Sequence, residues 1–107
     1  MVYRPTIGER PEPQAMIVAC VEQGAESMLL DAASCPDGFF DLSTGVAGDL
    51  LHRLSVYHLR LAVVVEDLTR YSRRFQEFAR EANQGRQFRF FDTSQAAEEW
   101  LNTPNVF

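Results

Sequence analysis

The chain contains no lysine, and all ten of its basic residues are arginine. Because it has fifteen acidic residues, its formal net charge is −5 at pH 7. Long-range electrostatics therefore disfavour nucleic acid and anionic membranes as partners. Residues 87–91 alternate phenylalanine with arginine, as RNA-stacking strands do, but the core needs those rings. We expect no nucleic-acid partner.

No stretch of the chain is long and apolar enough to span a bilayer. The longest apolar runs cover residues 16–21 and 61–65, whereas a membrane-spanning helix needs about 20 apolar residues. Near the N-terminus, Arg4 and Arg10 are accompanied by prolines and acids rather than by the apolar core of a secretory signal. We therefore expect a cytoplasmic protein with no membrane partner.

Cysteine is scarce, which excludes a disulfide framework and a cysteine-based zinc site. Cys20 and Cys35 stand alone, with no CxxC motif and no histidine at metal-ligand spacing. Free cysteine usually behaves as a small core residue. We predict two reduced, mostly buried thiols, with a redox role as the alternative.

The usual signatures of catalysis are also missing. There is no Ser-His-Asp order, no cysteine nucleophile with a base, no dinucleotide fingerprint and no P-loop. His52 and His58 fall on different expected elements, at a spacing that does not make a metal pair. The sequence therefore predicts no catalytic residue, no metal site and no cofactor.

The composition is that of one globular domain. The chain has 107 residues, of which 46% are hydrophobic and 23% charged. Residues 1–12 hold two prolines and a glycine and predict an extended N-terminal arm. We expect a single domain over residues 13–103. Pro104 should end the last helix and leave residues 104–107 as a frayed tail.

Hydrophobic periodicity and breaker residues predict four helices. Pro13 suits a helix entry and Gly24 a helix stop. Residues 16–21 are all apolar, so a buried strand is the alternative for that segment. Apolar residues three and four apart indicate the second and third helices, and Thr93 or Ser94 can cap the last one. The expected helices cover residues 14–23, about 44–57, 68–84, and a final segment from about 94.

Three strands are expected between these helices, at residues 27–31, 59–65 and 87–91. The β-branched run within 59–65 indicates burial on both faces, as in the centre of a parallel sheet. The order α-β-α-β-α-β-α predicts an α/β fold with helices packed on a small three-stranded, mainly parallel sheet. The arm adds at most a short strand near Val2–Tyr3. An open sheet edge would be covered by the arm or by a second subunit, and we expect a homodimer.

A polar loop before the second helix is the candidate binding or regulatory site. Its residues are Asp41, Ser43, Thr44, Gly45 and Gly48. Free backbone N–H groups and the helix dipole favour an anion at a helix N-terminus, so a phosphate there would be well placed, whether bound or covalently attached. The alternative is that Ser43 or Thr44 is simply an N-cap and the glycines permit close packing.

Two carboxylates follow the central strand. Glu66 and Asp67 lie at its carboxyl end, where α/β sheets usually place ligands, and could act as a general base or as metal ligands. The alternative is a solvated Glu66 beside an Asp67 that caps the third helix. A small hydrolase using either carboxylate is the lowest-ranked hypothesis.

Two family resemblances rest on these segments. The segments FFDLSTGVAGDLL, LRLAVVV and REANQGRQFRFF, within residues 39–91, resemble the bacterial family called domain of unknown function 4180. That family brings no established activity. The element order is also similar to the STAS domain of anti-sigma factor antagonists, and FFDTSQAAEEWL resembles the last strand and helix of that domain.

The STAS resemblance implies a phosphorylation switch. In that family a strand leads into a DSSG-type loop, whose serine at a helix N-terminus is phosphorylated by a partner kinase. Asp41, Ser43, Thr44 and Gly45 fall in the matching place, with Leu42 between the aspartate and the hydroxyls. Both families normally have strands ahead of the first helix, where this chain has the proline-containing arm.

The leading hypothesis is a non-enzymatic regulatory module of STAS-like fold that binds an unidentified protein partner. Binding would use residues 39–48 and the following helix, with Ser43 or Thr44 as the switch. A phosphate would add about −1.5 to −2 charges beside the partner. The alternative is a domain that holds a small anionic ligand or nucleotide at the same loop.

Overall fold

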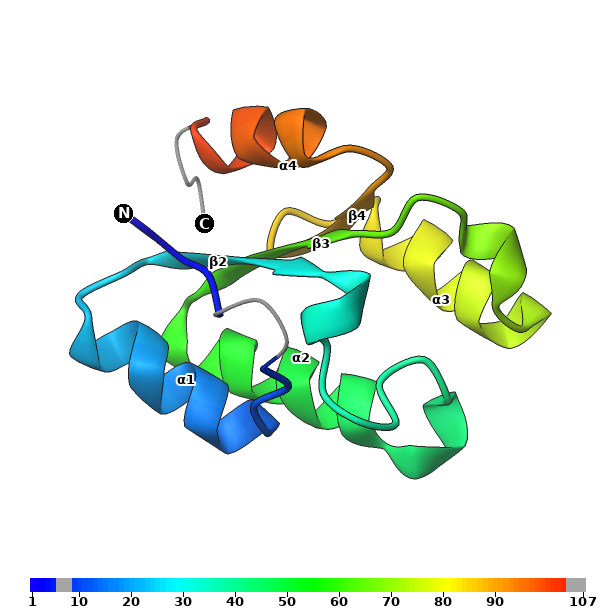
Figure 1. Cartoon of the computed structure of the whole chain (residues 1–107), viewed down its shortest axis with the longest axis horizontal. Helices are drawn as coiled ribbons and strands as arrows, with labels where there is room; N and C mark the ends of the chain where they lie inside the picture. Colours follow the sequence, from blue (N-terminus) through cyan, green and yellow to red (C-terminus); the bar gives the residue numbers. More distant parts are fainter. Residues whose placement is uncertain (6–8, 104–107) are drawn as a thin grey trace.

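The computed structural model describes residues 1–5 and 9–103. The expected frayed tail at residues 104–107, with its helix-ending Pro104, lies outside the described residues. Four parallel strands form one sheet in the order β1-β2-β3-β4, and four α-helices pack on it (Figure 1). The strands are β1 (Val2–Tyr3), β2 (Ser27–Asp31), β3 (Arg60–Val64) and β4 (Phe88–Phe91). The helices are α1 (Pro13–Glu22), α2 (Val46–Tyr57), α3 (Arg73–Ala82) and α4 (Ser94–Leu101).

The helices are distributed unequally over the two faces of the sheet. Helices α1, α2 and α3 lie below the sheet in Figure 1, and α4 lies alone above it. Parallel strands are joined by right-handed crossovers. Because the strand order follows the chain, each crossover advances in the same direction and places its helix on the same face. Only α4, which follows the last strand, covers the opposite face.

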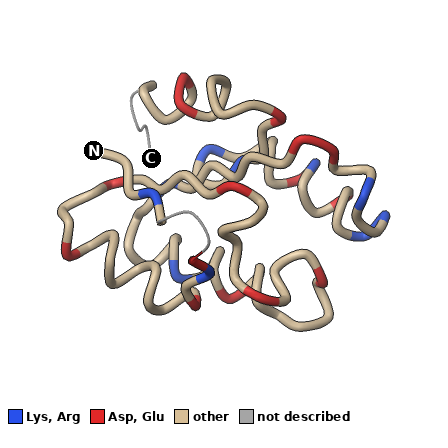
Figure 2. The backbone as a smooth tube through the Cα atoms, in the orientation of Figure 1, with Lys and Arg blue, Asp and Glu red and all other residues tan. Residues whose placement is uncertain are grey.

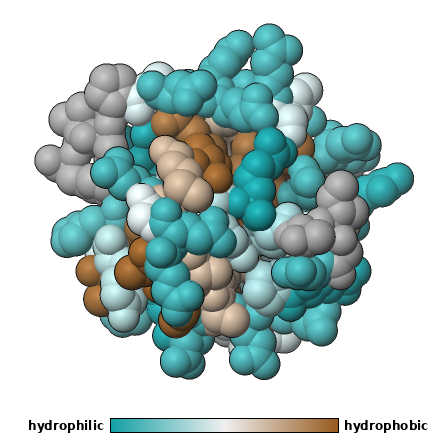
Figure 3. All heavy atoms as spheres, turned by 60° about the vertical axis from the view of Figure 1, so that its left-hand side comes forward, coloured by the Kyte–Doolittle hydropathy of each residue, from teal (hydrophilic) through white to brown (hydrophobic). Residues whose placement is uncertain are grey.

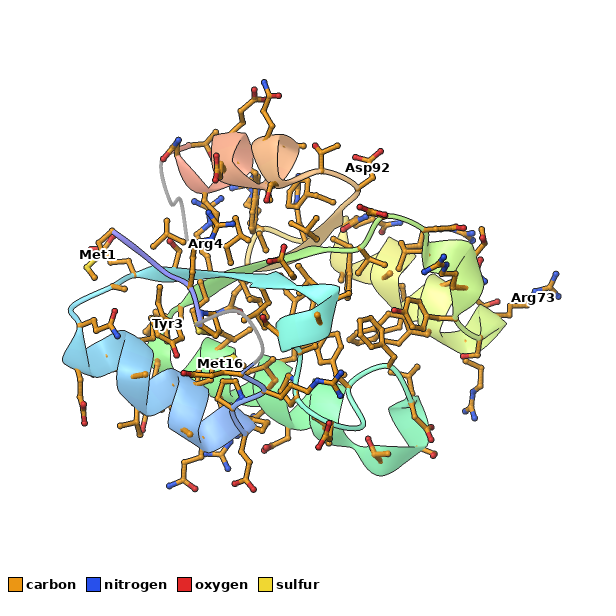
Figure 4. The ribbon with its side chains drawn as sticks, viewed as in Figure 1. Met1, Tyr3, Arg4, Met16, Arg73 and Asp92 are labelled. Carbon is orange, nitrogen blue, oxygen red and sulfur yellow. The ribbon has the colours of Figure 1, made fainter. Side chains whose placement is uncertain are left out.

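The sheet has four strands, so the expectation of three is wrong. The extra strand is β1 in the N-terminal arm, which pairs in parallel with β2 through Val2 opposite Ser27 and Tyr3 opposite Met28. Two residues before a proline are too few for a periodic pattern, so the local pattern indicates this strand only weakly. Tyr3 is buried and points toward α1 (Figure 4). The arm, rather than a second subunit, therefore covers the outer edge of β2.

The opposite edge of the sheet, formed by β4, also has fewer free backbone donors for another strand. The carbonyls of Gln87 and Phe91 accept hydrogen bonds from β3, so the N–H of Phe90 points outward. That N–H donates to the Asn83 side-chain oxygen at 2.7 Å, and Asn83 is the residue that ends α3. One outward-facing donor of this edge is therefore already satisfied, which makes the edge a poorer template for another strand.

Alternate residues of the strands enter two hydrophobic cores, which confirms β3 as a strand buried on both faces. The larger core lies between the sheet and α1 to α3, and the smaller core lies under α4. Phe39 is completely buried in the larger core, where its ring contacts those of Phe40, Phe75, Phe88 and Phe90. Fully burying a phenylalanine side chain contributes about 1.5–3 kcal/mol.

The expected helix over residues 68–84 is divided in two, and the helix expected from about residue 44 begins two residues later, as α2. Leu42–Thr44 forms a 3-10 turn, and Gly45 separates it from α2 with a φ of 78° that favours glycine. Leu68–Arg70 forms a second 3-10 turn, and α3 begins anew where the Ser72 hydroxyl accepts from the Phe75 N–H at 3.2 Å. The other expected elements agree within about two residues. Residues 16–21 lie in α1, so the strand alternative there is wrong.

Arg60 on β3 holds α4 on the sheet. Arg60 is 5% exposed, and its guanidinium donates to the carbonyls of Trp100 at 3.0 Å and Thr103 at 2.9 Å. It also lies 4.1 Å from the centre of the Trp100 ring. A cation at a helix C-terminus is stabilised by the helix dipole, and Arg60 shares the Trp100 carbonyl with the N–H and hydroxyl of Thr103. A charged side chain thus connects the central strand to the last helix.

We predict that Arg60→Met lowers the free energy of unfolding by about 1.5–3 kcal/mol, because the helix carbonyls lose a charged donor. Urea unfolding would measure the loss, and Trp100, the single tryptophan, would report a red-shifted emission as α4 loosens. Arg89→Met is the matched control, since Arg89 lies 5.5 Å from the same ring and caps no α4 carbonyl. Equal losses in both variants would contradict this role for Arg60.

Candidate functional site

The turn at Asp41 is built on one carboxylate. Asp41 precedes the 3-10 turn Leu42–Thr44 and accepts from the Ser43 N–H at 3.0 Å and from the Ser43 hydroxyl at 2.6 Å. These two hydrogen bonds stabilise the ionised carboxylate and lower the pKa of Asp41 below its ordinary value of 3.8, the side-chain bond contributing most. The Asp41 and Ser43 side chains are both exposed to solvent.

Thr44 fixes the loop from the inside. Its hydroxyl lies 2.7 Å from the Gly38 carbonyl oxygen and 2.8 Å from that of Asp41, and it accepts from the Val46 N–H at 3.2 Å. Gly38 has a φ of 82°, and a Cβ added there would lie 3.0 Å from the Thr44 hydroxyl. The close fit of Thr44 against Gly38 therefore requires glycine. Thr44 is a structural part of the turn.

All five residues predicted for the site are exposed at the start of α2. Asp41, Ser43 and Thr44 are joined by hydrogen bonds, and Gly45 turns the chain into α2. Gly48 lies one turn into the helix, where a Cβ would meet no atom within 4 Å. The first turn of α2 has no side-chain cap from Ser43, so a simple N-cap role for Ser43 does not describe the geometry.

The same turn occurs a second time. Asp67 accepts from the Thr69 N–H at 3.0 Å and from the Thr69 hydroxyl at 2.5 Å, and these bonds lower the pKa of Asp67 in the same way. Asp67 thus caps the 3-10 turn Leu68–Arg70, not α3 itself. The repeated Asp-Leu-Ser/Thr segments at residues 41–43 and 67–69 are the sequence signal for this repetition, and our sequence reasoning missed it.

Two adjoining pockets lie at the carboxyl edge of the sheet. The larger, of about 540 Å³, is bordered by Arg10, Asp41 and Tyr71, and the smaller, of about 300 Å³, by Glu66, Asp67 and Tyr71. Tyr71 stacks on Phe40, with ring centres 4.1 Å apart and an interplanar angle of 8°. The pockets bring both predicted polar segments to one region. No sequence pattern indicated Tyr71 or Arg10 as lining residues.

The charge of this region is mixed. Asp31 lines the smaller pocket together with Glu66 and Asp67, opposed by Arg70. Within residues 1–5 and 9–103, no three His, Cys, Asp or Glu side chains are grouped so that they could hold a metal ion. The carboxylate of Asp67 is occupied by its turn. Proton transfer at this pocket would therefore fall to Glu66 or Asp31.

The cysteines offer no reactive thiol at this edge. Cys35 borders the larger pocket, but burial, and next the nearby Asp31 charge, raise the pKa of its thiol to about 12. Burial also raises the pKa of Cys20. Both cysteines are free and buried, which confirms the expected thiols. A thiol that stays protonated is a poor nucleophile.

Nothing in the sheet topology provides a dinucleotide crevice. Open α/β sheets bind such ligands where the strand order reverses and neighbouring helices lie on opposite faces. Here α1, α2 and α3 share one face, and the four described strands follow the chain order without reversal. Among the described residues, no helix has the length and apolar character needed to cross a bilayer.

The fold and this site define a small parallel α/β domain with a polar, aspartate-capped turn at the carboxyl edge of its sheet. Residues 4–101 match the family described as domain of unknown function (DUF4180), so the chain belongs to that family, as its motifs indicated. Comparison with curated proteins found no match, and comparison with solved structures found none either.

We predict different effects of removing the two hydroxyls of the turn. Thr44→Val should lower the free energy of unfolding by about 1–2 kcal/mol, because the loop loses one hydroxyl donor to the Gly38 and Asp41 carbonyls and the Val46 N–H loses its acceptor. Ser43→Ala should cost less, since its hydroxyl bonds only to the solvated Asp41. Urea unfolding of the two variants provides the comparison. A larger loss for Ser43→Ala would contradict the assignment of Thr44 as the structural hydroxyl.

The two aspartate turns should also make stability depend on pH. Asp41 and Asp67 have pKa values below 3.8 in the folded protein, so the unfolded chain binds these protons more readily. Their contribution to stability is complete above pH 3.8 and is lost as pH falls through the folded pKa values. Carboxyl-carbon NMR should find both midpoints below 3.8. A midpoint at or above 3.8 for either residue would refute its cap.

Proposed function

We propose that this chain is a non-enzymatic regulatory module that acts in the cytoplasm and binds a protein partner. In this proposal the contact surface consists of residues 39–48 and α2, and phosphorylation of Ser43 switches binding. The alternation of strands and helices, with a hydroxyl pair just before α2, also supports a STAS-like relationship as part of the proposal.

The observation that carries the proposal is the difference between the two hydroxyls. Among residues 1–5 and 9–103, the exposed Ser43 hydroxyl has one hydrogen-bond partner, the exposed Asp41 carboxylate at 2.6 Å. Thr44 turns its hydroxyl inward to two carbonyl oxygens of the loop. A kinase that needs a free hydroxyl in an accessible loop would find Ser43 available, whereas Thr44 would first have to leave its turn.

A phosphate on Ser43 would reverse the electrostatics of the turn. The Ser43 hydroxyl now donates to Asp41, but a phosphoryl group adds about −1.5 to −2 charges and removes that proton. The carboxylate and the phosphate would then repel each other, and the 3-10 turn would lose its cap. The change lies directly beside α2, so a partner that contacts both segments would sense it.

We predict that protein carrying phosphoserine at position 43 melts at a lower temperature and loses hydrogen-exchange protection at the Ser43 amide. If repulsion from Asp41 is the cause, Asp41→Asn should reduce both effects of the phosphate. Calorimetry and NMR on the four matched proteins would measure this. A phosphate that leaves the Ser43 amide protected from hydrogen exchange would contradict the switch. A Ser43→Ala, Thr44→Ala double variant that binds every partner with unchanged affinity would contradict it as well.

A second candidate function is binding of a small ligand at the same edge, favoured by the pocket of about 540 Å³ beside the stacked Phe40 and Tyr71. For an anionic ligand or nucleotide, Arg10 is the cation that lines this pocket, and its guanidinium is paired with Asp37 at 3.1 Å. A thermal-shift screen distinguishes the two functions, since a ligand at one hundred times its dissociation constant stabilises by about 2.7 kcal/mol.

Self-association remains part of the proposal, although its expected cause has changed. An open strand edge was expected to drive a homodimer, but β1 covers one edge and Asn83 satisfies the outward-facing Phe90 N–H at the other. A dimer therefore needs a different surface.

A further inference from the structure

Arg60 is a buried cation that has no carboxylate partner among the described residues. It is 5% exposed, and its guanidinium bonds to two carbonyls and a hydroxyl at the C-terminal end of α4. The ion pairs within the described part of the chain do not include it; they are Arg4–Glu98, Arg10–Asp37 and Arg53–Asp49. Arginine is almost never fully buried unless it is paired. The charge of Arg60 is therefore compensated by dipoles alone.

One donor of this guanidinium has no acceptor. The two terminal nitrogens of Arg60 bond to Trp100 and Thr103, but its Nε–H is buried and has no hydrogen-bond partner within residues 1–5 and 9–103. A buried donor that stays unpaired costs free energy, more so when it belongs to a charged group. Buried polar side-chain atoms are paired in the large majority of cases. The Arg60 Nε–H is thus a strong donor that an added acceptor would satisfy.

Arg89 places a second guanidinium beside the first. Arg89 on β4 pairs in register with Ala62 on β3, two residues after Arg60, so both arginines lie on the sheet face that α4 covers. Their guanidiniums lie 4.1 Å and 5.5 Å from the centre of the same Trp100 ring. Figure 2 shows basic positions on the sheet beneath α4. Two cations therefore share one indole.

Arg89 is the more accessible of the two cations. It is partly exposed, and its Nε donates to a backbone carbonyl at 2.7 Å. Its terminal nitrogens have no hydrogen-bond partner among the described residues. The acids of α4 bond elsewhere. Glu98 pairs with Arg4 at 3.0 Å. Glu99 accepts from the Gln95 amide at 3.4 Å. The outer nitrogens of Arg89 are therefore open to a ligand.

Positive charge is in excess at this end of α4. Burial, and next the nearby charge of Arg89, lower the pKa of the Arg60 guanidinium below its ordinary value of 12.5. The C-terminus of α4 opposes this charge with the equivalent of about half a negative charge. The face of the Trp100 ring adds a further attraction. These partial charges are smaller than the two full charges of the arginines.

We propose that Arg60 and Arg89, beside Trp100, form a binding site for a small oxyanion of the phosphate or carboxylate type. A guanidinium presents parallel N–H groups that match the oxygens of either anion. Arg89 supplies its open terminal nitrogens, and Arg60 supplies its unpaired Nε–H. An oxyanion between two guanidiniums replaces their repulsion with two attractions.

The site is separate from the Ser43 turn. Arg60 begins β3 and Arg89 is the second residue of β4, so both lie at the amino end of the sheet, whereas the turn lies at the carboxyl edge. Figure 3 brings the amino end forward, and most atoms on that face are hydrophilic, with hydrophobic atoms near the top and at the lower left. Such a surface suits a hydrated anion.

The emission of Trp100, the single tryptophan, reports on this site directly. Sodium phosphate added to the full chain should change the emission to saturation, whereas sodium chloride at the same ionic strength should not. The NMR signal of the Arg60 Nε–H should shift with the same midpoint. Sodium acetate is the second probe. Binding of both anions assigns a general oxyanion site, and binding of one alone assigns the site to phosphates or to carboxylates.

Two matched variants locate the binding. Arg89→Met should weaken the apparent affinity for phosphate about tenfold or more, because charge-assisted hydrogen bonds are lost. Arg89 is the residue to change, since Arg60 also holds α4 on the sheet. Arg73→Met is the control, because it removes an equal charge from a side chain that extends into solvent at the far end of α3 (Figure 4). It should bind phosphate as the parent does.

Three results would overturn the proposal. The first is a parent chain in which neither phosphate nor acetate changes the Trp100 emission or the Arg60 Nε–H signal beyond the chloride control. The second is an Arg89→Met variant that binds phosphate like the parent. The third is an equal loss in Arg73→Met, which would show general charge attraction. Far-UV circular dichroism verifies that each variant is folded. The Ser43 switch does not depend on any of these results.

Discussion

Strand β3 is buried on both faces, and its parallel pairing with β2 and β4 determines where every helix lies. Its residues alternate between the core of α1 to α3 and the core of α4. Parallel strands in chain order require three crossovers of one hand, which fill one face and leave the other to α4. That last helix would lie on a small core alone without the guanidinium of Arg60, which reaches its C-terminal carbonyls from β3.

The same topology locates the polar turns. Parallel strands bring their carboxyl ends to one edge, so the segments that follow β2 and β3 lead into a common region. There the loop containing Asp41 and the turn at Asp67 border pockets that share Tyr71. The opposite, C-terminal ends of α1 and α2 carry the exposed side chains of Val21, Val56 and Tyr57 instead. The polar turns therefore lie at the other end of these helices from those apolar side chains.

Much of the fold could be predicted from the sequence, because periodic burial is a strong signal. The strand at Ser27–Asp31 was predicted with its observed bounds, and the helix and central strand patterns identified the α/β class. β1 was expected at most as a short strand near Val2–Tyr3 and was not counted in the sheet, because two residues are too few to show a period. The divisions at Gly45 and Ser72 depend on caps and on a positive φ, which periodicity does not report.

The candidate site shows a similar limit. The segment Asp41 to Gly48 was identified as a candidate site from its polar residues and glycines. The different roles of Ser43 and Thr44, however, depend on the direction in which each hydroxyl points. That direction is set by Gly38, whose positive φ brings its carbonyl to Thr44. The stacking of Phe40 on Tyr71 joins residues thirty-one positions apart, so no local sequence pattern predicts this contact.

The most direct test of the regulatory account is fragmentation mass spectrometry of the protein recovered from the cells that naturally produce it. The account predicts a phosphate on Ser43 in part of the population, with the Thr44 hydroxyl unmodified. A loop that is unmodified under every growth condition, or a phosphate on Thr44 with none on Ser43, would contradict it.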